Sequence, residues 1–127
     1  MQHNAPLILQ VEDEENIRKL ITVNLVQRNY QVVEAFTGQD GLDQLRDQTP
    51  DLLILNIRLP DMSGLYILDQ MDGKSLPLSD FPVIIISAFL IDTELILSQY
   101  PRVARIFTKP FDVKEVIGFI YQILPTS

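Results

Sequence analysis

The sequence predicts an α/β fold in which a doubly wound parallel sheet carries helices on both faces. Two observations predict it. Five short runs with strand character alternate with five stretches of helical spacing, which is the pattern of a parallel sheet with crossover helices. The runs Leu52–Leu55 and Val83–Ile86 are apolar throughout, as strands covered on both faces should be. The 127 residues suit one domain, with a core from about residue 6 to residue 124.

The elements follow one another in a regular order. The expected strands are Leu7–Val11, Gln31–Ala35, Leu52–Leu55, Pro82–Ser87 and Arg105–Thr108. The expected helices are Glu14 to Arg28, Gly41 to Arg46, the segment after Ser63, Thr93 to Tyr100, and Asp112 to about Leu124. Asp13, Ser63 and Asp112 are interpreted as N-caps. Gly73 to Asp80 is polar, contains a proline and is predicted to be a loop.

Composition excludes several classes of function. The chain has no cysteine, so it has no disulfide, thiolate metal site or catalytic thiol. Its net charge is −7 and its basic residues are scattered, which argues against direct nucleic-acid binding. No apolar run approaches the roughly 20 residues that span a bilayer, so we expect no membrane segment. Residues 1–6 do not resemble a signal peptide, and a cytoplasmic location is expected.

Polar side chains follow four of the predicted strands. They are Glu12 and Asp13, Asn56, Ser87, and Lys109. In an open parallel sheet the functional site lies beyond the carboxyl ends of the strands, so we expect these residues to converge. Paired carboxylates hold Mg²⁺, whereas a hydroxyl and an ammonium group bind phosphoryl oxygens. A carboxylate after the third strand would be the nucleophile of aspartyl-phosphate chemistry.

Each residue also has a purely structural interpretation. Glu12 and Asp13 taken alone are typical of a helix N-terminus, and Ser87 of a strand end. Lys109 alone is typical of a solvent-exposed position, and Asn56 of a turn. Asp51 and Asp61 are interpreted as structural residues, and no role is expected for His3. The joint placement of the five strand-end residues favours the functional interpretation.

Four segments resemble the signatures of the response-regulator receiver family of two-component signalling. They are Leu9-Gln10-Val11-Glu12-Asp13-Glu14, the block from Asp51 to Gly64, Ile86-Ser87-Ala88, and Thr108-Lys109-Pro110-Phe111. The resemblance covers almost the whole chain. It implies a flavodoxin-like (βα)5 fold with strand order 2-1-3-4-5. It also implies that the chain is a signalling domain of a phosphorelay and not an enzyme.

The resemblance also implies roles for individual residues. Glu12 and Asp13 match the acidic pair that positions Mg²⁺, and the backbone carbonyl of Arg58 matches a third ligand. Ser87 and Lys109 match the groups that contact the phosphoryl oxygens, and the Lys109–Pro110 bond is cis in such folds. The expected partners are a sensor histidine kinase or a phosphotransfer protein.

Two positions depart from the family pattern. Asn56 stands at the phosphoacceptor position, where the family has Asp, and a neutral amide is a poor nucleophile at phosphorus. Asn56 is either natural or introduced to block phosphorylation. Ile106 replaces an aromatic ring that moves on activation, and Phe107 should face the other side of the strand.

The amide should also weaken Mg²⁺ binding. Two carboxylates about 4 Å apart repel by about 4 kcal/mol at an effective dielectric of about 20, and a bound cation relieves this repulsion. Replacing one of three carboxylates lowers the gain from binding. The residues that would ligate the metal are Glu12, Asp13, Asn56 and Arg58.

The fourth helix, fifth strand and fifth helix carry much apolar surface. Either it is a generous core, or the surface near Leu95, Ile106 and Phe119 contacts an output domain, a partner protein or a second copy. An alternative is a flavodoxin-like or phosphatase-like enzyme or cofactor binder on the same fold. It lacks support because the chain has neither an Asp-x-Asp after the first strand nor a Gly-rich phosphate loop.

Overall fold

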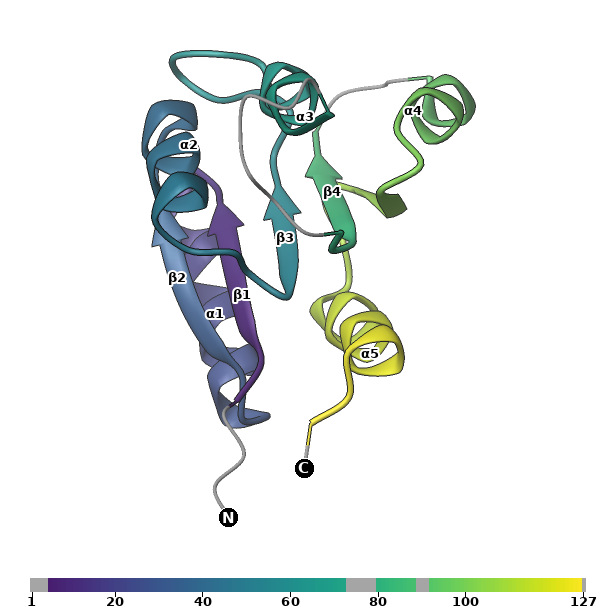
Figure 1. Ribbon diagram of the computed structural model, residues 1–127. Helices are drawn as coiled ribbons and strands as arrows, with labels where there is room; N and C mark the ends of the chain where they lie inside the picture. The colour runs from purple at the N-terminus through teal and green to yellow at the C-terminus, as the bar shows by residue number, and fades with distance from the viewer. Residues whose placement is uncertain (1–4, 73–79, 89–91, 127) are drawn as a thin grey trace.

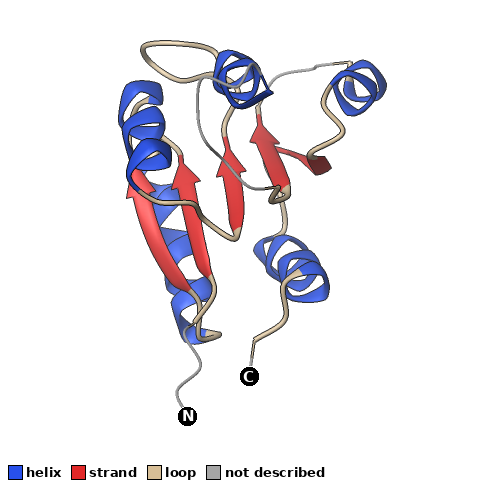
Figure 2. Cartoon of the chain, viewed as in Figure 1, coloured by secondary structure: helices blue, strands red, loops and turns tan. Residues whose placement is uncertain are grey.

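The computed structural model describes residues 5–72, 80–88 and 92–126. Its five strands form one parallel sheet in the order β2-β1-β3-β4-β5 (Figures 1 and 2), so the predicted fold class and strand order are confirmed. The strands are β1 (Leu7–Val11), β2 (Gln31–Ala35), β3 (Leu52–Leu55), β4 (Val83–Ser87) and β5 (Val103–Thr108).

Helices cover both faces of the sheet. They are α1 (Glu15–Gln27), α2 (Gly38–Asp47), α3 (Gly64–Asp72), α4 (Thr93–Gln99) and α5 (Val113–Ile123). Because side chains alternate along a strand, Ile8, Ile54 and Phe107 pack against α1 and α5, whereas Leu53 and Ile85 pack against α2, α3 and α4. None of the helices in the described part of the chain has the length and hydropathy needed to span a bilayer.

The parallel arrangement brings every strand's carboxyl end to one edge of the sheet. In Figure 1 this edge is the upper one, toward which the arrowheads of β1, β3 and β4 point. Two predicted structural roles are confirmed at the ends of elements. The Asp51 carboxylate accepts a hydrogen bond from the Leu7 amide at 2.7 Å, and the Asp112 carboxylate accepts from the Lys114 amide at 2.9 Å and caps α5.

The start of α1 differs from the prediction. Asp13 does not cap this helix, because the N-cap position is Glu14 and its side chain makes no capping hydrogen bond. Instead the Glu12 carboxylate Oε2 accepts from the Glu14 amide at 3.1 Å. The reason is that the Asp13 carboxylate is already engaged with Asn56 across the sheet edge.

The second helix begins three residues earlier than predicted, at Gly38. The Thr37 side chain accepts from the Asp40 amide, and the Asp61 carboxylate accepts from Gly38 at 2.8 Å and Gln39 at 2.9 Å. Asp61 is thus structural, as expected, but it acts on a helix that lies more than twenty residues before it in the chain.

The sheet ends at β5, an edge strand. It begins at Val103 and not at Arg105, because Val103 already pairs with Val83 of β4. The register then shifts by one residue, so that Arg105 pairs with Ile84. The guanidinium of Arg105 lies 4.4 Å from the Phe107 ring and 5.2 Å from the Phe119 ring. The two rings meet edge to face at 6.2 Å, so this cation covers an aromatic pair between β5 and α5.

Candidate functional site

The residues after the strand ends surround an open cavity of about 550 Å³ at the upper edge of the sheet. The residues that line it are Asp13, Glu14, Asn56, Arg58, Leu59, Pro60, Ala88 and Lys109. Glu12 is not among these residues, and both Glu12 and Asn56 are almost fully buried. The topology therefore brings together four of the predicted residues, Glu12, Asp13, Asn56 and Lys109.

Asn56 lies at the centre of the site and is only 5% exposed. Its amide nitrogen Nδ2 donates to Glu12 Oε2 and Asp13 Oδ1, both at 3.2 Å, and to the Arg58 carbonyl at 3.0 Å. Its carbonyl oxygen Oδ1 accepts from the Arg58 amide at 3.3 Å. The two N–H bonds of one amide group are thus shared among three oxygen atoms that converge on it.

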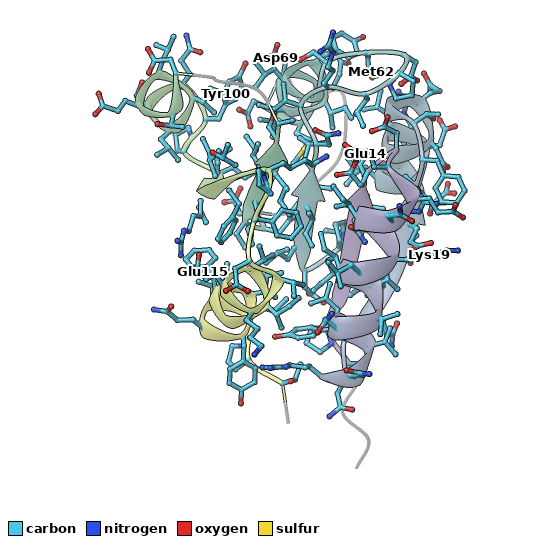
Figure 3. All side chains as sticks on the ribbon, turned by 180° about the vertical axis from the view of Figure 1, so that it is seen from behind. Glu14, Lys19, Met62, Asp69, Tyr100 and Glu115 are labelled. Carbon is cyan, nitrogen blue, oxygen red and sulfur yellow. The ribbon has the colours of Figure 1, made fainter. Side chains whose placement is uncertain are left out.

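Lys109 is held by two carboxylates. Its ammonium lies 2.9 Å from Glu12 Oε1 and 3.0 Å from Glu14 Oε1, and its side chain is 7% exposed. The Lys109–Pro110 peptide bond is cis, as expected. Sequence reasoning did not assign Glu14 to the site, because its position at the start of α1 is explained equally well by the helix dipole. Figure 3 shows Glu14 at this end of α1.

Burial and pairing act in opposite directions on the charges. Burial raises the pKa of Glu12, although the Lys109 ammonium and the Glu14 amide oppose this change. Burial alone would lower the pKa of Lys109, but the Glu12 and Glu14 carboxylates outweigh it, and the pKa of Lys109 is raised. Lys109 therefore stays charged at neutral pH, beside two acidic residues.

Ser87 is placed differently from the other site residues. It ends β4 next to the site, but it is only 1% exposed and does not line the cavity, where Ala88 is found instead. Its backbone carbonyl accepts from the Lys109 amide at 2.9 Å, which joins the ends of β4 and β5. Ile106 packs on the α2–α4 side of the sheet and Phe107 on the α1–α5 side, so the predicted alternation is confirmed.

The oxygen atoms suit a hard cation, but the Asn56 amide nitrogen lies among them. Glu12, Asp13 and the Arg58 carbonyl are ligands of the kind that Mg²⁺ prefers. All three already accept hydrogen bonds from Asn56 Nδ2, so a cation at that point would face N–H protons. Within the described residues, no three Asp, Glu, His or Cys side chains are grouped so that they could hold a metal ion.

Comparison with known families identifies the family of this chain. The sequence pattern of the response regulator receiver domain matches residues 8–121. The chain belongs to this family. The receiver domain is a signalling domain of two-component systems, and the alternative of an enzyme or cofactor binder on the same fold gains no support from the match.

Curated relatives agree with this assignment. The receiver domain is 33% identical over 112 residues to the transcriptional regulatory protein KdpE of Mycobacterium tuberculosis, covering 88% of this chain and 48% of the relative. It is 36% identical over 124 residues to the response regulator ArlR of Staphylococcus aureus, covering 92% and 52%. The chain thus spans about half the length of these relatives.

Solved structures are similar to the receiver domain along most of its length. A CheY-like receiver domain protein of Methanospirillum hungatei shares the fold with a TM-score of 0.82 at 21% identity, covering 94% of each chain. The receiver domain of HemR from Leptospira biflexa has a TM-score of 0.81 at 27% identity and 96% coverage of each. TrrA of Thermotoga maritima, solved with Mg²⁺-BeF, has a TM-score of 0.77 at 26% identity, covering 94% and 99%.

The surface predicted to contact partners is only partly exposed. Leu95 on α4 is 50% exposed, whereas Ile106 and Phe119 are half-buried and pack against opposite sides of the sheet. Leu97 on α4 and Tyr121 on α5 are also exposed. Leu90 and Ile91, two further apolar residues just before α4 in the sequence, lie outside the described residues.

Proposed function

We propose that this receiver domain does not accept a phosphoryl group at residue 56 and acts as a binding module in its signalling pathway. The observation that carries the proposal is the hydrogen bonding of Asn56. The amide that stands in place of a nucleophilic carboxylate donates to the Glu12 and Asp13 carboxylates and to the Arg58 carbonyl.

The chemistry of the amide supports this proposal. A nucleophile at phosphorus needs an available electron pair, but the amide nitrogen lone pair is delocalised and the amide oxygen is neutral. The groups proposed to receive the phosphoryl oxygens are also engaged. Lys109 is paired with Glu12 and Glu14, and Ser87 is buried. An incoming phosphoryl group would have to compete with these contacts.

We propose further that Glu12, Asp13, Asn56 and the Arg58 carbonyl bind Mg²⁺ weakly. An amide donor already satisfies the three oxygens that the family resemblance assigns to the metal. Cation binding would require the Asn56 amide to turn and present Oδ1, which now accepts from the Arg58 amide. The gain from relieving repulsion is also smaller with two carboxylates than with three.

The partners follow from the family. We propose a sensor histidine kinase or a phosphotransfer protein as the upstream partner, and an output domain or partner protein, or a second copy of this chain, at the surface around Leu95, Ile106 and Phe119. Among these three residues, Leu95 is the most exposed and would make the first contact. We expect this domain neither to bind nucleic acid directly, given its net charge of −7, nor to leave the cytoplasm.

The competing proposal is an ordinary phosphorylatable receiver in which Asn56 was introduced to block the reaction. It is favoured by the rest of the site, because Glu12, Asp13 and Lys109 meet at the same edge of the sheet. The two proposals predict the same behaviour for the chain with Asn56. They differ in whether Asn56→Asp restores a competent site.

The experiment uses acetyl phosphate with Mg²⁺, followed by intact-mass measurement. The chain with Asn56 should show no added phosphoryl group, and a labile phosphate mapped to residue 56 would refute the proposal. Asn56→Asp tests the remaining site, and gain of one base-labile phosphoryl group would favour the competing proposal. Asn16→Asp, on the exposed face of α1, is the control for added negative charge.

A further inference from the structure

A buried arginine lies directly behind the acidic residues of the site. Arg18 extends from α1 toward the sheet, and its side chain is only 7% exposed. Its guanidinium Nη1 donates to the Glu12 carbonyl at 3.0 Å and to the Asp13 carbonyl at 3.5 Å. These are the backbone groups of the two residues whose carboxylates accept from Asn56, so Arg18 contacts the acidic pair through its backbone and is not among the residues that line the cavity.

Two side chains on and just after β2 hold the guanidinium. Glu34 Oε1 lies 3.7 Å from Arg18 Nε, and the Phe36 ring lies 3.8 Å from the guanidinium carbon. The Thr22 hydroxyl donates to Glu34 Oε2 at 2.6 Å, which fixes that carboxylate against α1. Phe36 is 52% exposed, so one face of the clamp is formed by a surface ring.

Gln10 ties the same helix to β1. Its side-chain nitrogen donates to the Arg18 carbonyl at 3.3 Å and to the Thr22 hydroxyl at 3.0 Å. Despite these contacts, Arg18 Nε makes no hydrogen bond within the described residues. Burying a guanidinium that is incompletely bonded costs free energy, so the arrangement is not one that maximises stability.

The Arg18 guanidinium points toward the backbone carbonyls of Glu12 and Asp13. Hydrogen bonds from a charged donor are shorter and stronger than those between neutral groups. The Arg18 guanidinium bonds closely to the Glu12 carbonyl, at 3.0 Å, and lies at the outer limit of hydrogen bonding, at 3.5 Å, from the next carbonyl, that of Asp13. Contacts to consecutive carbonyls restrain the orientation of the peptide between them. The Glu12 and Asp13 side chains leave the backbone on either side of that peptide, so their separation depends on it.

We propose that Arg18 is a positioning residue for Glu12 and Asp13, and that Glu34 and Phe36 hold it in place. Arg18 does not touch the cavity. It acts through the backbone of the acidic pair, and the same geometry serves whether residue 56 is Asn or Asp. This inference is therefore independent of the proposal that residue 56 takes no phosphate.

The test reads the acidic pair through the Asn56 side-chain NH₂ signals in the NMR spectrum of the whole chain. Arg18→Met removes the donors and keeps a long apolar side chain. We expect solvent exchange of the Asn56 NH₂ protons and of the Glu14 amide to become at least roughly tenfold faster, because bonds to a charged group are lost. Lys19→Met is the matched control, since Lys19 is exposed on the outer side of α1 (Figure 3) and pairs with Glu15.

A general loss of stability is separated from positioning by amides in the centre of the sheet. If Arg18 only stabilised the fold, exchange in buried β4 would accelerate together with that of Asn56. Phe36→Ala provides a milder variant at the surface, and it should produce the same local change with a smaller amplitude. Phe36→Tyr should restore the slow exchange because it keeps the ring.

The proposal is overturned if the Asn56 and Glu14 signals keep their shifts and exchange rates in Arg18→Met. It is overturned equally if exchange rises uniformly across the sheet in Phe36→Ala, or if Lys19→Met has the same effect as Arg18→Met. Should Arg18→Met not fold, the two Phe36 variants alone decide between the outcomes.

Discussion

The substitution Asn56→Asp is the sharpest test of how the site is balanced. It replaces one NH₂ group by an oxygen atom. The amide nitrogen lies 3.2 Å from both Glu12 Oε2 and Asp13 Oδ1, so the new oxygen would face two carboxylate oxygens at close range. The change removes three hydrogen bonds and adds a negative charge in a buried position.

The size of the effect follows from two estimates. Two carboxylates about 4 Å apart repel by about 4 kcal/mol at an effective dielectric of about 20. Protonating an Asp at pH 7 against a usual pKa of about 3.9 costs about 4 kcal/mol, which limits the penalty. The Lys109 ammonium, 2.9 Å from Glu12, offsets part of it. We expect Asn56→Asp to lower the free energy of unfolding by about 2–4 kcal/mol without metal, and a typical domain survives such a loss.

Urea unfolding in chelator and in millimolar Mg²⁺ measures this loss. With a slope of about 2 kcal/mol per molar, the midpoint in chelator should fall by about 1–2 M. Mg²⁺ should raise the midpoint of the Asn56→Asp variant more than that of the unsubstituted chain, because only the variant offers three carboxylates. Asn16→Asp should change neither midpoint appreciably. The reasoning is wrong if the variant is as stable as the unsubstituted chain in chelator, or if Mg²⁺ stabilises the unsubstituted chain as much as the variant.

Three further predictions concern stability and titration. Gly64→Ala should destabilise the protein by roughly 1–3 kcal/mol in urea unfolding, because a Cβ there would overlap the backbone carbonyl of Asn56. Gly118→Ala in α5 meets no atom and should stabilise the protein by about 0.5–1 kcal/mol. Equal effects of the two substitutions would contradict this prediction. Backbone hydrogen bonds lower the pKa of Asp61, so its contribution is complete above pH 4 or so and disappears as the pH falls through its folded-state pKa. Asp61→Ala should therefore cost about 1 kcal/mol at neutral pH and less in acid, and a pH-independent difference in unfolding free energy would argue against the cap. The Asp69 carboxylate accepts a hydrogen bond from the Tyr100 hydroxyl at 2.7 Å and raises the pKa of Tyr100 to about 12. Asp69→Asn should therefore lower the pH at which tyrosinate absorbance appears. An unchanged absorbance titration would contradict this hydrogen bond.

The sequence predicted the sheet well because hydrophobic patterning is a local signal. β1, β2 and β3 begin and end at the expected residues. The start of α2 was missed, because the carboxylate that caps it belongs to Asp61. The start of β5 was missed for a similar reason, since its register is set by pairing with β4.

The site was predicted through its positions but not through its contacts. Topology alone brings Glu12, Asp13, Asn56 and Lys109 to one edge, and this part followed from the order of the strands. The pairing of Lys109 with Glu14 joins residues 95 positions apart and has no local signal. Arg18 was missed because a basic residue in a helix is ordinarily exposed, and only the fold shows that this one turns inward.

Arg105 has a consequence for how the molecule behaves in a crowded solution. An unpaired outer strand offers its amides and carbonyls to any other extended chain, and such pairing is a route to aggregation. The charged guanidinium of Arg105 on β5 packs against the Phe107 ring of the same strand and the Phe119 ring of α5. A second extended chain that paired with β5 would have to desolvate this charge or displace it from the rings. Arg105 therefore opposes the addition of a strand at this edge of the sheet.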